Sequence, residues 1–140
     1  MSTDIRTDIY LPHPPERVWQ ALIDPAQLAV WLMPNDFQPR VGHRFNFRTD
    51  PAPGFDGVIQ CEVLAITPGE LLRIGWAGGP GLDTTVTWQL APDGRGTRLL
   101  LTHEGFDQAD PRQQAVRRLL DSGWRGHLTR RLQHLLNTLP

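Results

Sequence analysis

The chain has 140 residues, a formal net charge of −1 and 39% hydrophobic residues, which predicts one domain, residues 1–140, with a core of its own. A single cysteine excludes a disulfide scaffold, a four-cysteine zinc site and a paired-cysteine redox motif. The 14 basic residues, all arginine, are spread along the chain, so we expect no nucleic-acid partner. No apolar run nears the ~20 residues of a membrane span. We therefore expect a soluble cytoplasmic protein without a signal peptide or a membrane span.

The first predicted element is a strand from Thr3 to Leu11, whose apolar residues share one parity. Two short helices follow. Pro15 suits the first position of one helix that ends near Asp24, and Asp24 followed by Pro25 is a start signal for the next. Pro34 is expected to end this second helix.

From Gly42 to Phe106 the apolar residues alternate with polar ones, which predicts five successive strands. Their inward-facing residues are Phe45 and Phe47; Ile59, Cys61, Val63 and Ala65; Leu72, Ile74 and Trp76; Val86, Trp88 and Leu90; and Leu99, Leu101 and His103. Glycine- and proline-rich turns at residues 53–57, 67–69, 77–81 and 92–94 separate them, so consecutive antiparallel hairpins are expected.

Asp110 followed by Pro111 is a third helix start, and we expect Gly123 to interrupt the helix that it opens. An amphipathic helix of about four turns is then predicted, with an apolar stripe of Trp124, Leu128, Leu132, Leu135, Leu136 and Leu139. This order of elements indicates an α+β fold in which the last helix covers the inner face of one curved antiparallel sheet.

Several short motifs occur in an order that resembles a known family. They lie at residues 14–22, 61–64 and 96–106 and at Gly123 and Trp124. In this order they resemble the activator of heat-shock-protein-90 ATPase homologue (AHSA-like) family, of the START-like or SRPBCC helix-grip superfamily. The resemblance implies a Bet v 1-like sheet of six or seven strands gripped around the C-terminal helix, and a cavity for an apolar small molecule between them. The family name also implies a link to a co-chaperone.

Large rings are the strongest functional signal, because parity places them on the inner face of the sheet or on the helices that close it. One alternative is that they simply fill the interior at native packing density. The other is a pocket that they line. On the second interpretation the ligand-binding residues are Trp31, Phe45, Phe47, Trp76, Trp88, His103, Trp124 and Leu128.

The reactive residues do not form a recognisable catalytic or metal motif. The stretch from His103 to Asp107 lacks the second histidine of a zinc helix. His103 itself should point inward, either as a core histidine with a local partner or as the polar contact of a pocket. Cys61 is expected to be a buried apolar residue rather than a nucleophile. We therefore expect no catalytic residue, no metal and no cofactor.

The leading hypothesis is a non-enzymatic protein that binds an apolar, ring-bearing small molecule. One alternative is a protein-interaction module that uses its arginines and outward leucines. Another is a cyclase- or hydrolase-like enzyme that uses the same cavity. Leu64, Leu71 and Leu100 interrupt the polar side of their strands, and on that ground we predict a weak homodimer.

Overall fold

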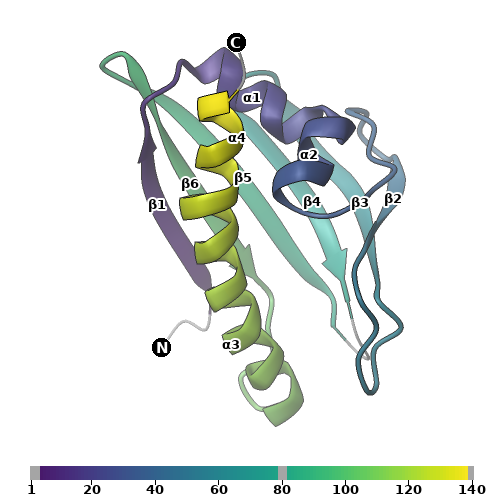
Figure 1. Ribbon diagram of the computed structural model, residues 1–140. Coiled ribbons are helices and arrows are strands. Elements are labelled where there is room, and N and C mark those ends of the chain that lie inside the picture. The colour runs from purple at the N-terminus through teal and green to yellow at the C-terminus, as the bar shows by residue number, and fades with distance from the viewer. Residues whose placement is uncertain (1–3, 79–81, 139–140) are drawn as a thin grey trace.

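Six antiparallel strands form one curved sheet in the computed structural model, which describes residues 4–78 and 82–138. Within those residues the strands are β1 (Ile5–Leu11), β2 (Arg44–Arg48), β3 (Val58–Thr67), β4 (Leu71–Ala77), β5 (Thr84–Asp93) and β6 (Gly96–Glu104), in the spatial order β1-β6-β5-β4-β3-β2 (Figure 1). The five expected hairpin strands are confirmed, and β1 pairs with β6 at one edge. Thr3, Leu139 and residues 79–81 lie outside the described residues.

The two short helices are α1 (Pro15–Ile23) and α2 (Pro25–Trp31), each with proline at its first position. One carboxylate oxygen of Asp24 accepts a hydrogen bond of 3.0 Å from the backbone N–H of Ala26, which caps α2 as expected. The apolar faces of both helices are buried. Together with the end of the C-terminal helix they cover one end of the concave face (Figure 1).

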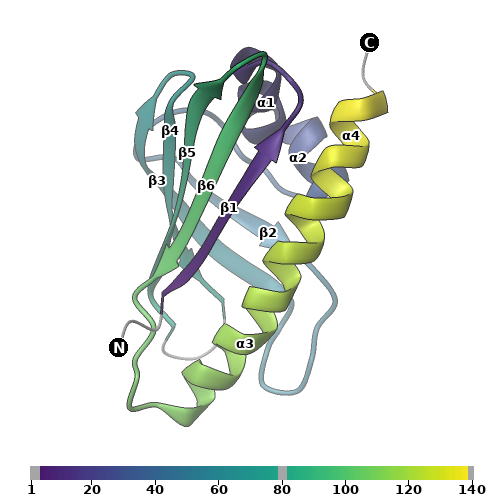
Figure 2. The ribbon, with the colours of Figure 1, turned by 90° about the vertical axis from the view of Figure 1, so that its left-hand side faces the viewer.

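The C-terminal helix is longer than expected, because Gly123 does not interrupt it. It runs without a break through α3 (Pro111–Gly126), a π-helical stretch η1 (His127–Leu132) and α4 (Gln133–Thr138), and crosses the open side of the sheet (Figure 2). A glycine inside a helix costs only about 1 kcal/mol relative to alanine. The buried side chains of Trp124, Leu128 and Leu132 on the following turns offset that cost.

The inner face of the sheet carries the residues that parity assigned to it, with one correction. A register shift between Val63 and Ala65 pairs Ala65 with the exposed Arg73 and Ile66 with the buried Leu72, so Ile66 faces inward in place of Ala65. The backbone pairs Trp76 with Thr84 and Val86 with His103, and all four side chains are buried. Two residues further along β5, Trp88 pairs with Leu101 of β6. These strands therefore present their large side chains to the helix, which forms the other layer of the core.

The outer face of the sheet is mixed rather than apolar. Leu64 is 42% exposed, whereas Leu71 and Leu100 are half-buried. Gln89 pairs with both of the latter and so stands between them. The weak homodimer stays a prediction, which light scattering over a range of protein concentrations tests. Among the described helices, none is both long and apolar enough to span a membrane.

Candidate functional site

An open cleft of about 800 Å³ lies between α3 and the loop that joins β2 to β3. Both segments reach the same end of the molecule, the lower end in Figures 1 and 2. The residues that line the cleft are Leu32, Met33, Thr49, Ala52, Pro53, Gly54, Phe55, Ile59, Trp76, Gly78, Arg112, Ala115, Val116, Leu119, Leu120, Gly123, Trp124 and His127. Most of them are apolar, so the cleft offers hydrophobic area to a ligand.

One face of the C-terminal helix forms a whole wall of the cleft. Its lining residues recur at separations of three and four positions, which is the spacing of a single helix face. We call them the helix stripe: Arg112, Ala115, Val116, Leu119, Leu120, Gly123, Trp124 and His127. Leu119 is 75% exposed although it is a large apolar residue. An apolar helix face normally packs against the core, so this stretch of α3 presents hydrophobic surface that the protein does not cover itself.

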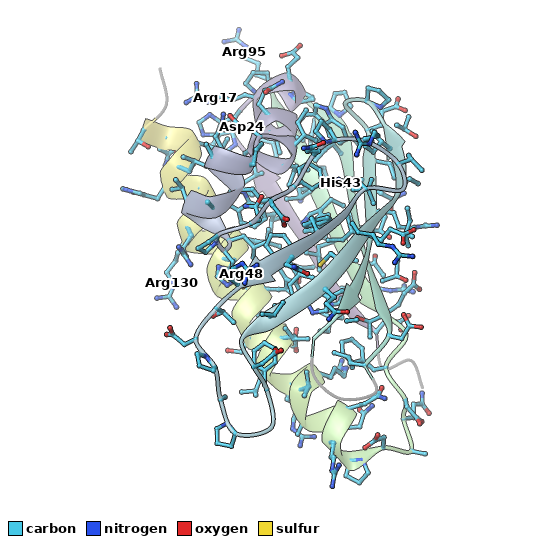
Figure 3. All side chains as sticks on the ribbon, turned by 90° about the vertical axis from the view of Figure 1, so that its right-hand side faces the viewer. Arg17, Asp24, His43, Arg48, Arg95 and Arg130 are labelled. Atoms are coloured by element: carbon cyan, nitrogen blue, oxygen red, sulfur yellow. The ribbon has the colours of Figure 1, made fainter. Side chains whose placement is uncertain are left out.

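The opposite wall is a loop of residues 49–57, which is shaped by backbone hydrogen bonds. The N–H of Thr49 donates to the carbonyl of Gly57 at 2.8 Å, and Ala52 and Phe55 exchange backbone hydrogen bonds of 2.9 and 2.8 Å. Gly57 has a φ of +84°, and a side chain there would collide with the Thr49 carbonyl oxygen. Figure 3 labels Arg48, at the point where this loop leaves β2.

Two tryptophans form the inner wall, and buried hydrogen bonds fix their positions. The rings of Trp76 and Trp124 lie 5.4 Å apart. The Trp124 indole N–H donates to Nδ1 of His103 at 3.1 Å. Because Nδ1 is the acceptor, Nε2 of His103 carries the proton and donates to the Thr84 hydroxyl at 2.8 Å. That hydroxyl donates in turn to the Trp76 carbonyl at 2.7 Å.

His103 lies behind this tryptophan wall and does not line the cleft. Its side chain is fully buried, and burial lowers its pKa to about 3, so the imidazole is neutral at physiological pH. Of the two roles weighed for it, the geometry matches the core histidine with local partners. Its hydrogen bonds hold the indole of Trp124 and, through Thr84, the backbone of Trp76.

The other predicted rings lie deeper, where no open space remains. Phe45, Phe47 and Trp88 border a part of the interior without room for a water molecule. Trp31 is fully buried, and its indole N–H donates to the Ala21 carbonyl at 2.7 Å. Leu128 is fully buried in the helix interface.

The expectation of one space shared by the rings of Phe45, Phe47, Trp76, Trp88 and Trp124 therefore needs a correction. The rings do form one chain of contacts on the concave face, with centroids 5.3 to 5.8 Å apart from Phe45 to Trp88. Close packing fills that chain, and the cleft touches only its outer members, Trp76 and Trp124. A ligand-binding role for the set stays a prediction.

Few polar groups face the cleft. Nδ1 of His127 lies 3.0 Å from the carbonyl of Trp31, and since a carbonyl only accepts, Nδ1 carries the proton. Burial lowers the pKa of His127, so the ring is neutral and its Nε2 is an acceptor. Arg112 and Thr49 are the other polar side chains of the lining, and none of the described lining residues is a carboxylate or a thiol.

The thiol of Cys61 lies outside the cleft. Burial raises its pKa, which keeps it protonated and unreactive, as expected for a residue that packs as an apolar side chain. Among residues 4–78 and 82–138, no three histidine, cysteine or acidic side chains are grouped in a way that could hold a metal ion. The chemistry that the described cleft offers is hydrophobic contact with a few hydrogen-bonding groups.

Several lining residues were not among the predicted site residues, notably Phe55, Leu119 and His127. The helix stripe could have been found by continuing the three- and four-residue spacing from Val116 past Gly123. We expected the helix to break at Gly123, and that expectation hid the continuation. Phe55 lies in a turn, and alternation along the strands carries no signal for a side chain that reaches the site from a loop.

A family model and several solved structures match this chain. The family model of the Activator of Hsp90 ATPase homolog 1-like protein matches residues 12–137. The protein MLL2253 from Mesorhizobium loti is 35% identical over 98% of both chains, with a TM-score of 0.85. The protein BH1534 from Bacillus halodurans is 27% identical over 95% of this chain and 96% of its own, with a TM-score of 0.79.

CalU16 from Micromonospora echinospora, 21% identical over 96% of this chain and 76% of its own, has a TM-score of 0.78 and shares the fold. No curated protein matches the chain. The resemblance seen in the sequence motifs is thus confirmed at the level of family and fold.

Proposed function

This chain belongs to the activator of Hsp90 ATPase homolog 1-like family, and we propose that it binds an apolar, ring-bearing small molecule in the cleft between α3 and the β2–β3 loop. The observation that carries the proposal is the cleft itself, with a volume of about 800 Å³ and a mainly apolar lining. Ligand sites of drug-sized molecules typically have volumes of about 300–1,000 Å³ with a few polar groups. The edges and faces of Trp76, Trp124 and Phe55 suit an aromatic ligand.

Binding without turnover is supported by the polar groups of the lining. General acid–base catalysis needs a proton donor and a proton acceptor close to the reacting atoms. In the described lining His127 is a neutral acceptor and Arg112 is a permanent cation. Neither Cys61 nor His103 reaches the cleft. The described lining therefore brings hydrophobic area to the ligand but no pair of groups suited to proton transfer.

The proposal is tested with N-phenyl-1-naphthylamine, a neutral apolar dye whose fluorescence rises in hydrophobic sites. We expect saturable binding to the wild-type protein. Leu119→Gln should weaken it about fivefold, because a half-covered leucine contributes roughly 1 kcal/mol of hydrophobic contact. Val41→Gln is the matched control, since Val41 is 60% exposed and lies outside the cleft lining. Both side chains are exposed, so neither change should disturb folding.

Two outcomes would contradict the proposal. One is the absence of saturable dye binding, and the other is equal affinity in Leu119→Gln and Val41→Gln. Native mass spectrometry after exposure to a lipophilic metabolite extract then identifies the natural ligand. The bound mass should disappear when the dye is added in excess, which shows that the two share one site.

A further inference from the structure

We infer that the ligand of the cleft is an extended apolar carboxylic acid that lies along α3 with its carboxylate at Arg112. This inference rests on the proposed function and specifies the chemical class of the ligand and its orientation. It depends on the two polar ends of the helix stripe, Arg112 and His127, which differ in charge and in hydrogen-bonding capacity.

Arg112 is a cation without a counter-ion among the residues that the structure describes. Among residues 4–78 and 82–138, no hydrogen bond or ion pair is made by its guanidinium, and its backbone N–H is the only part of it that contacts Asp110. Some arginines of the chain are paired, for example Arg44 with Glu62 at 3.2 Å and Arg125 with Asp121 at 3.3 Å. Arg112 differs from the other arginines because it lines the described cleft. A guanidinium presents donors in a fork that matches the two oxygens of a carboxylate.

Arg112 lies at the N-terminal end of its helix. It is the second residue of α3, and the first turn contains no acidic residue. The N-terminus of a helix carries a partial positive charge that normally favours acidic side chains. Asp110 lies beside it, but one of its carboxylate oxygens accepts the backbone N–H of Arg112 at 2.9 Å as the helix cap. Because the Asp110 carboxylate already complements the helix end, the guanidinium of Arg112 is the group here that an anionic ligand group would complement.

His127, at the other end of the stripe, offers an anion no free hydrogen-bond donor. His127 is neutral, and its Nδ1–H is already used by the Trp31 carbonyl. Nη1 of Arg131 also lies 3.4 Å from Nδ1, but two protonated groups do not hydrogen bond to each other. The remaining nitrogen, Nε2, carries a lone pair, which repels a carboxylate and can accept a hydrogen bond from a hydroxyl group. The two ends thus fix the orientation of a molecule with one acid group.

The distance between the two ends sets the shape of the ligand. A helix rises about 1.5 Å per residue, so the stripe from Arg112 to His127 is about 22 Å long. Between them the helix contributes only Ala115, Val116, Leu119, Leu120, Gly123 and Trp124 to the cleft. A long acyl chain and a linear ring system both match this shape, and they share the chemistry of an apolar carboxylate.

The experiment compares acids with their methyl esters as competitors of N-phenyl-1-naphthylamine. One pair is dodecanoic acid and methyl dodecanoate, and the other is biphenyl-4-carboxylic acid and its methyl ester. In the wild-type protein we expect the acid of at least one pair to bind about fivefold to tenfold more tightly than its ester, as a charge-assisted hydrogen bond at a partly exposed site provides. The pair with the larger preference distinguishes an acyl chain from a ring system.

Arg112→Gln should abolish the preference for the acid by lowering the affinity of the acid more than that of the ester. The matched control is Arg118→Gln, because Arg118 is an exposed arginine of the same helix outside the cleft. It removes the same charge and should keep the preference. A preference that survives in Arg112→Gln, or that both variants lose equally, overturns the inference.

The experiment also separates this inference from the proposed function. If the neutral dye binds and the wild-type protein treats acids and esters alike, only the carboxylate assignment is wrong. If the dye does not bind, direct calorimetric titration with the two acids decides. Binding that depends on Arg112 supports the assignment, and no binding overturns both proposals.

Discussion

The hydrogen bonds behind the tryptophan wall make a quantitative prediction for Thr84→Val. The Thr84 hydroxyl accepts from Nε2–H of His103 at 2.8 Å and donates to the Trp76 carbonyl at 2.7 Å. Valine has nearly the same volume, so without opening a cavity the change leaves Nε2–H of His103 unpaired and removes one hydrogen bond from the Trp76 carbonyl. The unpaired donor costs about 1–3 kcal/mol, and the lost hydrogen bond costs about 1 kcal/mol more. We expect the free energy of unfolding to fall by about 2–4 kcal/mol, measured by urea denaturation.

Thr87→Val is the matched control on the same strand. The Thr87 hydroxyl accepts a hydrogen bond of 3.1 Å from Nε of Arg73, and Arg73 is exposed, so water can replace the lost partner. Its effect on the free energy of unfolding should stay within about 0.5 kcal/mol. Equal losses in the two variants would refute the reasoning, because both remove one β-branched hydroxyl from β5 and differ only in what that hydroxyl contacts.

Three further results are expected. Gly57→Ala should destabilise the protein more than Gly54→Ala in thermal denaturation: both glycines have positive φ, but only at Gly57 does a new side chain strike the backbone of the loop. The thiol of Cys61, whose pKa burial raises, should react with a disulfide reagent only after unfolding in urea; fast labelling of the native protein would contradict its burial. Burial lowers the pKa of His103 to about 3, below that of an exposed histidine. The neutral side chain therefore contributes fully to stability above pH ~6.5, and this contribution is lost as the pH falls toward 3. The free energy of unfolding should change by at most about 1.4 kcal/mol per pH unit in this range. Urea denaturation at pH 7.0 and 5.5 should show a smaller difference in His103→Gln than in the wild-type protein, and equal differences would contradict the assignment.

The fold could be predicted from the sequence because its local signals agree with one another. Proline after a capping residue marks the starts of α2 and α3, and glycine- and proline-rich turns separate strands of clear alternation. The break expected at Gly123 is the exception. Local propensity disfavours glycine in a helix, and burial of Trp124 and Leu128 outweighs it, which only the tertiary packing reveals.

The site could be predicted only in part, for a different physical reason. Parity correctly places Trp76 and Trp88 on the same face of the sheet, but it says nothing about how far along that face the helix packs closely. The volumes of the side chains and the curvature of the sheet decide where the interior is full. Trp88 lies in the closely packed part of the interior and Trp76 lies at the cleft. Both occupy inward-facing positions of alternating strands, so the sequence pattern does not distinguish them.

This division explains how one layer of aromatic rings can serve both the fold and a ligand. Where Phe45, Phe47 and Trp88 pack together they leave no space, so their contact energy stabilises the fold. At the other end the same row of rings meets α3, whose apolar stripe continues beyond the last ring of the core to Leu119. The hydrogen bonds of His103 connect the two parts, because they fix Trp124 at the boundary. A ligand that fills the cleft would extend the core along the helix rather than rearrange it, and the pre-formed wall would keep the entropic cost of binding low.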